Sequence, residues 1–103
     1  MACKVVSVFR RTDTNRVWHT QAFNKKSVNR DFIKESMRVG LLGDRRTETQ
    51  IDDLTLRIES VWDSREEYEE FMAIPAVKAH FDFVALYNMN MGIKAEPKEF
   101  IEV

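Results

Sequence analysis

The stretch Leu54–Phe71, with the sequence LTLRIESVWDSREEYEEF, decides the fold class of this 103-residue chain. In its first half, mainly apolar positions alternate with polar ones, as they do in a strand when one of its faces is buried. The positions on the apolar face are Leu54, Leu56, Ile58, Ser60 and Trp62. Ser64 and Glu67 then form a capping box, in which each side chain satisfies a free backbone amide at a helix start. The stretch therefore predicts a strand that runs directly into a helix.

The residues downstream predict a second helix and a last strand. Pro75 interrupts the first helix and suits the first turn of another. The apolar stripe of this second helix consists of Val77, Phe81 and Val84, and Asn90-Met91-Gly92 ends it. Lys98–Val103 alternates again and predicts the final strand.

The N-terminal part predicts a hairpin followed by a helix. Lys4–Arg11 is rich in β-branched and aromatic residues, which favour a strand. A polar turn follows, and Arg16–Gln21 predicts a short return strand on which His19 is expected at the surface. Ser27–Leu41 predicts a helix. The apolar face of that helix is formed by Val28, Phe32, Ile33 and Met37.

A further strand is predicted just before the deciding stretch. Thr47, Thr49 and Ile51 alternate in the opposite phase to Leu54 and the residues after it. Because a phase change moves side chains to the other face, it indicates a turn between two strands, or a bulge, and we favour the turn.

This order of elements predicts one domain, residues 1–103, of the α+β class: a ferredoxin-like antiparallel sheet with helices on one face. The strand from Leu54 and the strand from Lys4 together carry apolar residues on what we expect to be both faces of the sheet. A small chain with a sheet apolar on both sides favours burial against a second copy, so we expect a homodimer.

Composition excludes several classes of protein. Hydrophobic residues make up 44% and charged residues 32% of the chain, so it can form a small core and is neither collagen-like nor a disordered acidic tail. Its one cysteine, Cys3, allows no internal disulfide, and with two histidines it offers no zinc-ligand spacing, so no metal is expected. We expect a cytoplasmic protein without a membrane segment, because no long apolar stretch or signal peptide is evident.

Charge is distributed unevenly along the chain. Residues 1–46 hold eleven Lys and Arg against four Asp and Glu, whereas residues 47–103 hold five against thirteen. The basic half supplies a candidate surface for nucleic acid or an acidic partner protein, or for contacts with the chain's own acidic half. Its residues are Lys25, Lys26, Arg30, Lys34 and Arg38.

Val61–Phe71, followed by Ala76–Phe81, resembles the dimeric α+β barrel superfamily, which includes antibiotic-biosynthesis-monooxygenase-like and haem-degrading proteins. The resemblance covers residues 54–83 and rests on Trp62-Asp63-Ser64 at the strand-to-helix junction. It implies that two sheets pair face to face in a homodimer. Tryptophan closing the core and serine capping the helix are structural roles, so the motif indicates fold more than activity.

The resemblance separates two kinds of activity. Haem-degrading members are similar to one another in a helix Trp, a His ten residues later and an Asn on the first strand. This chain has Phe71 and Phe81 at the first two positions, with His80 adjacent, and no Asn in Val5–Val8, so no cofactor is expected. Cofactor-free monooxygenases use Trp and Tyr six residues apart, as Trp62 and Tyr68 stand here, although both residues also suit a structural core.

These observations leave three functions open. The leading hypothesis is a homodimeric binding or accessory protein that encloses a small apolar ligand against Phe71, Phe81, Val84 and Met91, residues that could equally be core. The alternative is a cofactor-independent monooxygenase-like enzyme on small aromatic substrates, using Trp62, Tyr68 and His80. In that enzyme His80 is a general base; otherwise it is a partly buried, hydrogen-bonded histidine. The third function is binding of nucleic acid or of an acidic partner protein by the basic surface described above.

Overall fold

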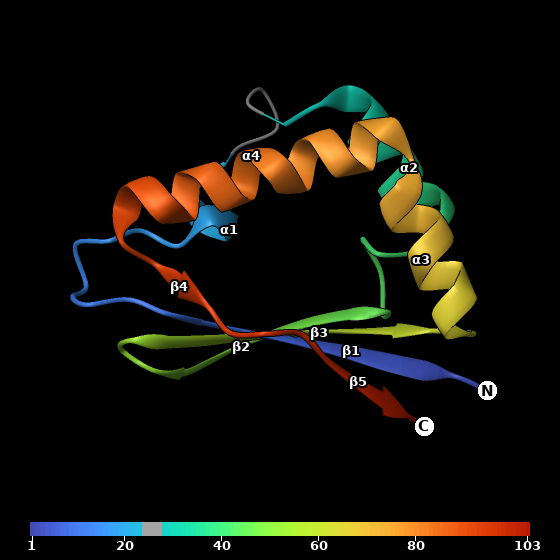
Figure 1. Ribbon diagram of the computed structural model, residues 1–103, viewed down its shortest axis with the longest axis horizontal. Helices are drawn as coiled ribbons and strands as arrows, with labels where there is room; N and C mark the ends of the chain where they lie inside the picture. Colours follow the sequence, from blue (N-terminus) through green and yellow to red (C-terminus); the bar gives the residue numbers. More distant parts are fainter. Residues whose placement is uncertain (24–27) are drawn as a thin grey trace.

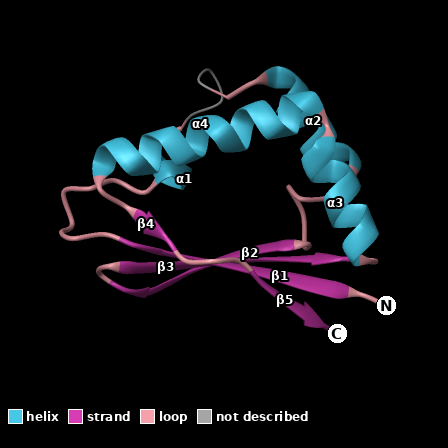
Figure 2. Cartoon of the chain, viewed as in Figure 1, coloured by secondary structure: helices cyan, strands magenta, loops and turns pink. Residues whose placement is uncertain are grey.

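A computed structural model of the chain describes residues 1–23 and 28–103. Five strands form one sheet, and the helices lie together on one side of it (Figures 1 and 2). In chain order the elements are β1 (Cys3–Arg10), α1 (His19–Ala22), α2 (Arg30–Arg38), β2 (Arg46–Asp52), β3 (Thr55–Trp62), α3 (Arg65–Ala73), α4 (Pro75–Met91), β4 (Lys94–Ala95) and β5 (Glu99–Glu102).

The sheet is antiparallel throughout, with the strand order β2-β3-β1-β4, and β5 pairs with the other end of β1. β1 and β3 pair along their whole length, from Cys3 opposite Trp62 to Arg10 opposite Thr55. Two short strands, β4 and β5, thus fill the position of the fourth strand of a ferredoxin-like sheet. The predicted fold class is confirmed.

The strand-to-helix junction has the predicted local chemistry. The Glu67 amide donates to Ser64 Oγ at 3.1 Å, which caps α3. The Glu67 carboxylate accepts from the Asp63 amide at 2.9 Å and from the Arg45 guanidinium at 2.7 Å. Arg45, from the basic half of the chain, also pairs with Asp63 at 3.2 Å. This junction therefore joins the basic and acidic halves of the chain within one molecule.

The turn predicted between two strands lies at Asp53 and Leu54, where β2 meets β3. The Leu54 amide donates to Asp52 Oδ1 at 2.8 Å, so the Asp52 side chain stabilises the turn. The register also shifts between Gln50 and Asp52, so an irregularity accompanies the turn.

The predicted return strand at Arg16–Gln21 is wrong, because His19–Ala22 form the short helix α1. Trp18, at its N-cap, is 1% exposed and packs with Leu56 and Ile93. The Arg11 guanidinium lies 4.4 Å from the centre of the Trp18 ring. Burial of the Trp18 side chain, rather than strand pairing, determines the conformation of this segment.

The first predicted helix is shorter than expected. Its described part is α2, Arg30–Arg38, and the predicted start at Ser27 lies outside the described residues. Met37, predicted on the buried face, is 63% exposed, whereas Ser36 is 2% exposed. Phe32 packs against the core, so the buried face is centred one position earlier than the apolar pattern indicated.

The pairing register places apolar residues on both faces of the sheet, as expected, and shows which residues lie on each face. Ile58 and Trp62 of β3 share a face with Cys3 and Ser7 of β1, and this face, the inner face, carries the helices (Figure 1). The opposite, outer face holds the charged side chains of β3, Arg57 and Glu59. Its apolar residues come from three strands: Val6 and Val8 of β1, Val61 of β3 and Ile101 of β5.

Candidate functional site

The packing of the inner face is tight at its two ends and looser between them. One buried cluster, at the α3 end, contains Trp62, Tyr68, Phe71 and Val77 with Cys3 and Val5 of β1. The other contains Trp18, Leu56 and Ile93. Between the clusters, Ser7 and Ser60 on the two central strands are only half-buried. The middle of the inner face is therefore its least completely buried part.

The edge strand β2 lies beside this middle region. All seven of its residues are exposed, including Arg46 and Glu48, which the register places on the inner face. Their side chains form an ion pair at 3.1 Å. We call the residues of this region the inner site: Ser7, Ile58 and Ser60 of the central strands, Arg46 and Glu48 of β2, and His19, Phe23, Phe32 and His80 of the helical layer.

Aromatic rings connect the sheet to the helices across the inner site. The ring centres of Phe9 and His19 are 5.0 Å apart, and those of His19 and Phe23 are 6.3 Å apart, both edge to face. Phe23 in turn lies 6.3 Å from His80, and His80 stacks on Phe32 at 3.7 Å. Two imidazoles are thus part of a continuous aromatic surface.

His19 is the least expected member of the inner site. It is 7% exposed, and its Nδ1 is buried without a hydrogen-bond partner among the described residues. Burial, together with the charge of Arg46, lowers the pKa of His19 to about 4, against the opposing charge of Glu48. The imidazole is therefore neutral at pH 7. Its predicted surface position is wrong, and the tryptophan preceding it was the one signal of burial.

His80 lies on α4, half-buried, with its ring stacked on Phe32. Burial lowers the pKa of His80 below the ordinary histidine value, so this imidazole is also neutral at pH 7. The structure thus brings the predicted candidate base His80 and the unpredicted His19 to the same aromatic surface.

Trp62 and Tyr68 lie together beside the inner site, with ring centres 5.5 Å apart. Both are buried. Trp62 Nε1 donates to Ser60 Oγ at 2.9 Å, and the Lys98 ammonium donates to the Tyr68 hydroxyl at 2.6 Å. Their polar atoms are therefore already hydrogen-bonded in the folded chain, and the Trp62 indole is joined to Ser60 of the inner site.

The four predicted ligand-lining residues divide between two places. Phe71 and Phe81 both contact Phe32, with ring centres 6.4 and 5.6 Å away, so they border the inner site. Val84 is buried on α4, and Met91 packs against the Trp18 cluster.

Further polar atoms in the interior have no partner among the described residues: Trp18 Nε1, Thr20 Oγ1, Ser36 Oγ and Asn88 Oδ1.

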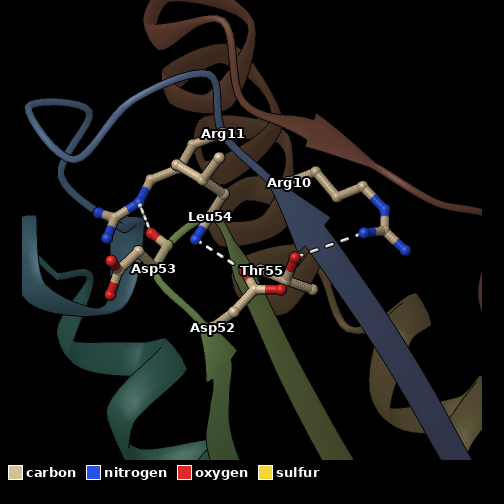
Figure 3. A pocket seen from close by; sticks show the side chains of 6 residues that line it. All are labelled: Arg10, Arg11, Asp52, Asp53, Leu54 and Thr55. Atoms are coloured by element: carbon tan, nitrogen blue, oxygen red, sulfur yellow. Dashed lines mark hydrogen bonds between the residues drawn. The ribbon is translucent and has the colours of Figure 1, made fainter.

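An open depression of about 510 Å³ lies at the β2–β3 turn (Figure 3). The Arg11 guanidinium donates to the Asp53 carbonyl at 2.8 Å, and Arg10 donates to Thr55 Oγ1 at 3.3 Å. Both guanidinium groups thus bond to the chain itself, Arg11 to the turn and Arg10 to the start of β3, so these polar groups stabilise the connection between β2 and β3. A second depression, of about 400 Å³, lies between the end of α4 and β4.

The basic residues Arg30, Lys34 and Arg38 lie on the exposed side of α2, and Arg38 pairs with Glu35 at 2.7 Å. Lys25 and Lys26 lie outside the described residues.

Within residues 1–23 and 28–103, no three His, Cys, Asp or Glu side chains gather as metal ligands would. In the same part of the chain, none of the helices combines the length and apolar character that crossing a membrane requires.

Comparison with protein-family models and with curated protein sequences finds no match. Among solved structures, the chain is similar to a mutant of SnoaB, a cofactor-independent oxygenase from Streptomyces nogalater. The sequences are 12% identical, and the TM-score is 0.58 over 99% of this chain and 92% of that chain. The likeness shows the fold: the α+β arrangement of an antiparallel sheet with helices on one face, expected from the sequence, is shared with that structure.

Proposed function

We propose that the chain acts as a homodimeric protein that binds a small aromatic molecule at the inner site. One observation carries this proposal: two neutral histidines lie within a continuous aromatic surface between the two tight core clusters. Aromatic faces and edges bind flat rings well, and a few polar atoms among them orient the ligand. The exposed strand β2 provides the side from which a ligand enters.

The first test is binding of 2-methylnaphthalene, a flat aromatic molecule without a polar group, measured by calorimetry. We expect binding in the micromolar range that weakens about tenfold in Phe32→Ala, because Phe32 stacks on His80 and contacts Phe71 and Phe81. Met37→Ala, on the exposed side of the same helix, is the matched control and leaves binding unchanged. Absence of binding to the wild-type chain would refute the proposal.

Oxygenation of a bound aromatic molecule is the second candidate function. It is supported by the fold shared with a cofactor-independent oxygenase and by the neutral imidazoles, which can accept a proton from an acidic substrate. In this function Trp62 and Tyr68 border the substrate and His80 is the base. The test is oxygen uptake with aromatic polyphenols. A rate reduced in His80→Gln and in Trp62→Phe supports it, and uptake no faster than without protein contradicts it.

The proposed dimer uses the outer face of the sheet. The exposed Val61 and the half-buried Val8 and Ile101 lie there around the buried Val6, and no helix in the described part of the chain lies on this face (Figure 1). Lys4 and Glu59, paired at 3.5 Å, border this apolar strip, so two copies can offer each other both apolar and charged contacts. Sedimentation at micromolar concentration tests the dimer. We expect Val8→Glu to yield single chains; a wild-type protein that sediments as single chains would contradict the dimer.

A further inference from the structure

We propose that His19 determines ligand specificity, by holding a ring hydroxyl of the bound aromatic molecule through its Nδ1 atom. The inference rests on the proposed binding at the inner site and goes further by naming the side chain that selects hydroxylated aromatic molecules over those without a hydroxyl. His19 was not among the residues that the sequence pattern singled out for function.

The geometry around His19 supports a recognition role. The ring lies edge to face against Phe9 of the sheet and Phe23 after α1, and these contacts fix its orientation. The Nδ1 atom within this aromatic setting is buried and unpartnered among the described residues. Buried polar atoms in native proteins nearly always have a hydrogen-bond partner, so an unpartnered one calls for a group that the chain itself does not supply.

The surrounding charges indicate a neutral hydroxyl rather than an anion. Arg46, the guanidinium that acts on His19, is already paired with Glu48 at 3.1 Å. An anionic group placed here would therefore lose its water without gaining an unpaired cation. A neutral imidazole has one donor and one acceptor nitrogen, and a hydroxyl both donates and accepts. A hydroxyl consequently satisfies Nδ1 in either tautomer.

The test compares two ligands of nearly equal shape, 2-naphthol and 2-methylnaphthalene, by calorimetry at pH 7. We expect the wild-type chain to bind 2-naphthol about tenfold more tightly, since a buried nitrogen left unpaired is costly. His19→Phe keeps the edge-to-face packing and removes this preference. His19→Gln, which still donates and accepts, retains part of it. Gln21→Ala, on the exposed side of the same short helix, is the control and retains all of it.

The wild-type chain provides an independent readout that needs no variant. In nitrogen NMR of the histidine rings, 2-naphthol shifts the His19 Nδ1 resonance and 2-methylnaphthalene does not. Equal affinities for the two ligands, or a preference that persists in His19→Phe, would overturn the role of His19 and leave an ordered water as the partner of Nδ1. If neither ligand binds, the proposed function itself fails, which is a different outcome.

Discussion

The acid sensitivity of the fold depends on His19, because this side chain must stay neutral to remain buried. Its pKa is about 4 in the folded chain, against 6.5 for an unperturbed histidine. Between these two values the unfolded chain binds a proton that the folded chain does not. Stability therefore falls as the pH decreases from 6.5 towards 4, and this contribution is constant below both pKa values.

The pKa difference sets the size of the effect. For one group with these two values, the free energy of unfolding falls by about 2 kcal/mol between pH 7 and pH 5, and by about 3 kcal/mol on reaching pH 4. Urea unfolding at a fixed protein concentration measures it, since a dimer's stability depends on concentration. His19→Gln carries no titrating group at this position, so we expect it to lose about 2 kcal/mol less than the wild type over pH 7 to 5.

Comparing the wild-type protein with His19→Gln removes the contribution that other titrating side chains make to the pH dependence. Carboxylates titrate in both proteins, and so does His80, whose lowered pKa adds a loss of stability in the same direction. An NMR titration of the His19 ring gives its folded pKa directly. Equal losses of stability in the wild type and His19→Gln, or a His19 ring that titrates near 6.5, would refute the reasoning.

Three further predictions concern the elements that hold the inner site. Ser64→Ala removes the cap of α3 and lowers the free energy of unfolding by about 1 kcal/mol in urea titrations; Ser64→Asp, which can still cap, restores most of it. Gly92→Ala costs about 1 kcal/mol by the same measurement, because residue 92 ends α4 with a φ of +68°. Val77→Ala leaves a cavity in the α3-end core and costs about 2 kcal/mol, whereas Lys78→Ala beside it costs under about 0.5 kcal/mol.

The strand-to-helix junction was predictable because its physics is local. Alternation through Leu56 and Trp62, the Ser64 cap and Pro75 each act within a few residues, and all are found in the structure. The segment around Trp18 was not predictable in this way, since four helical residues show no period. Its conformation depends on packing against Leu56 and Ile93, which lie far away in the sequence.

The residues of the candidate site also divide into those that a local sequence pattern reveals and those whose burial depends on distant parts of the chain. His80 could be found from its place beside the apolar stripe of a long helix, and the structure places it in the inner site. His19 could not be found, because its burial depends on a helix that the local pattern did not reveal. Ser36 was missed for a related reason: a small polar residue on a buried face is indistinguishable from a surface serine in the sequence.

The polar atoms of the molecule distinguish the inner site from the depression at the β2–β3 turn. At the turn, Arg10, Arg11 and Asp52 all bond to neighbouring groups of the chain (Figure 3). On the inner side, His19 Nδ1 and Ser36 Oγ are buried without partners among the described residues. Unsatisfied buried groups reduce stability unless a ligand or water completes them. The unpartnered polar atoms therefore favour the inner site over the turn as the place of the proposed ligand.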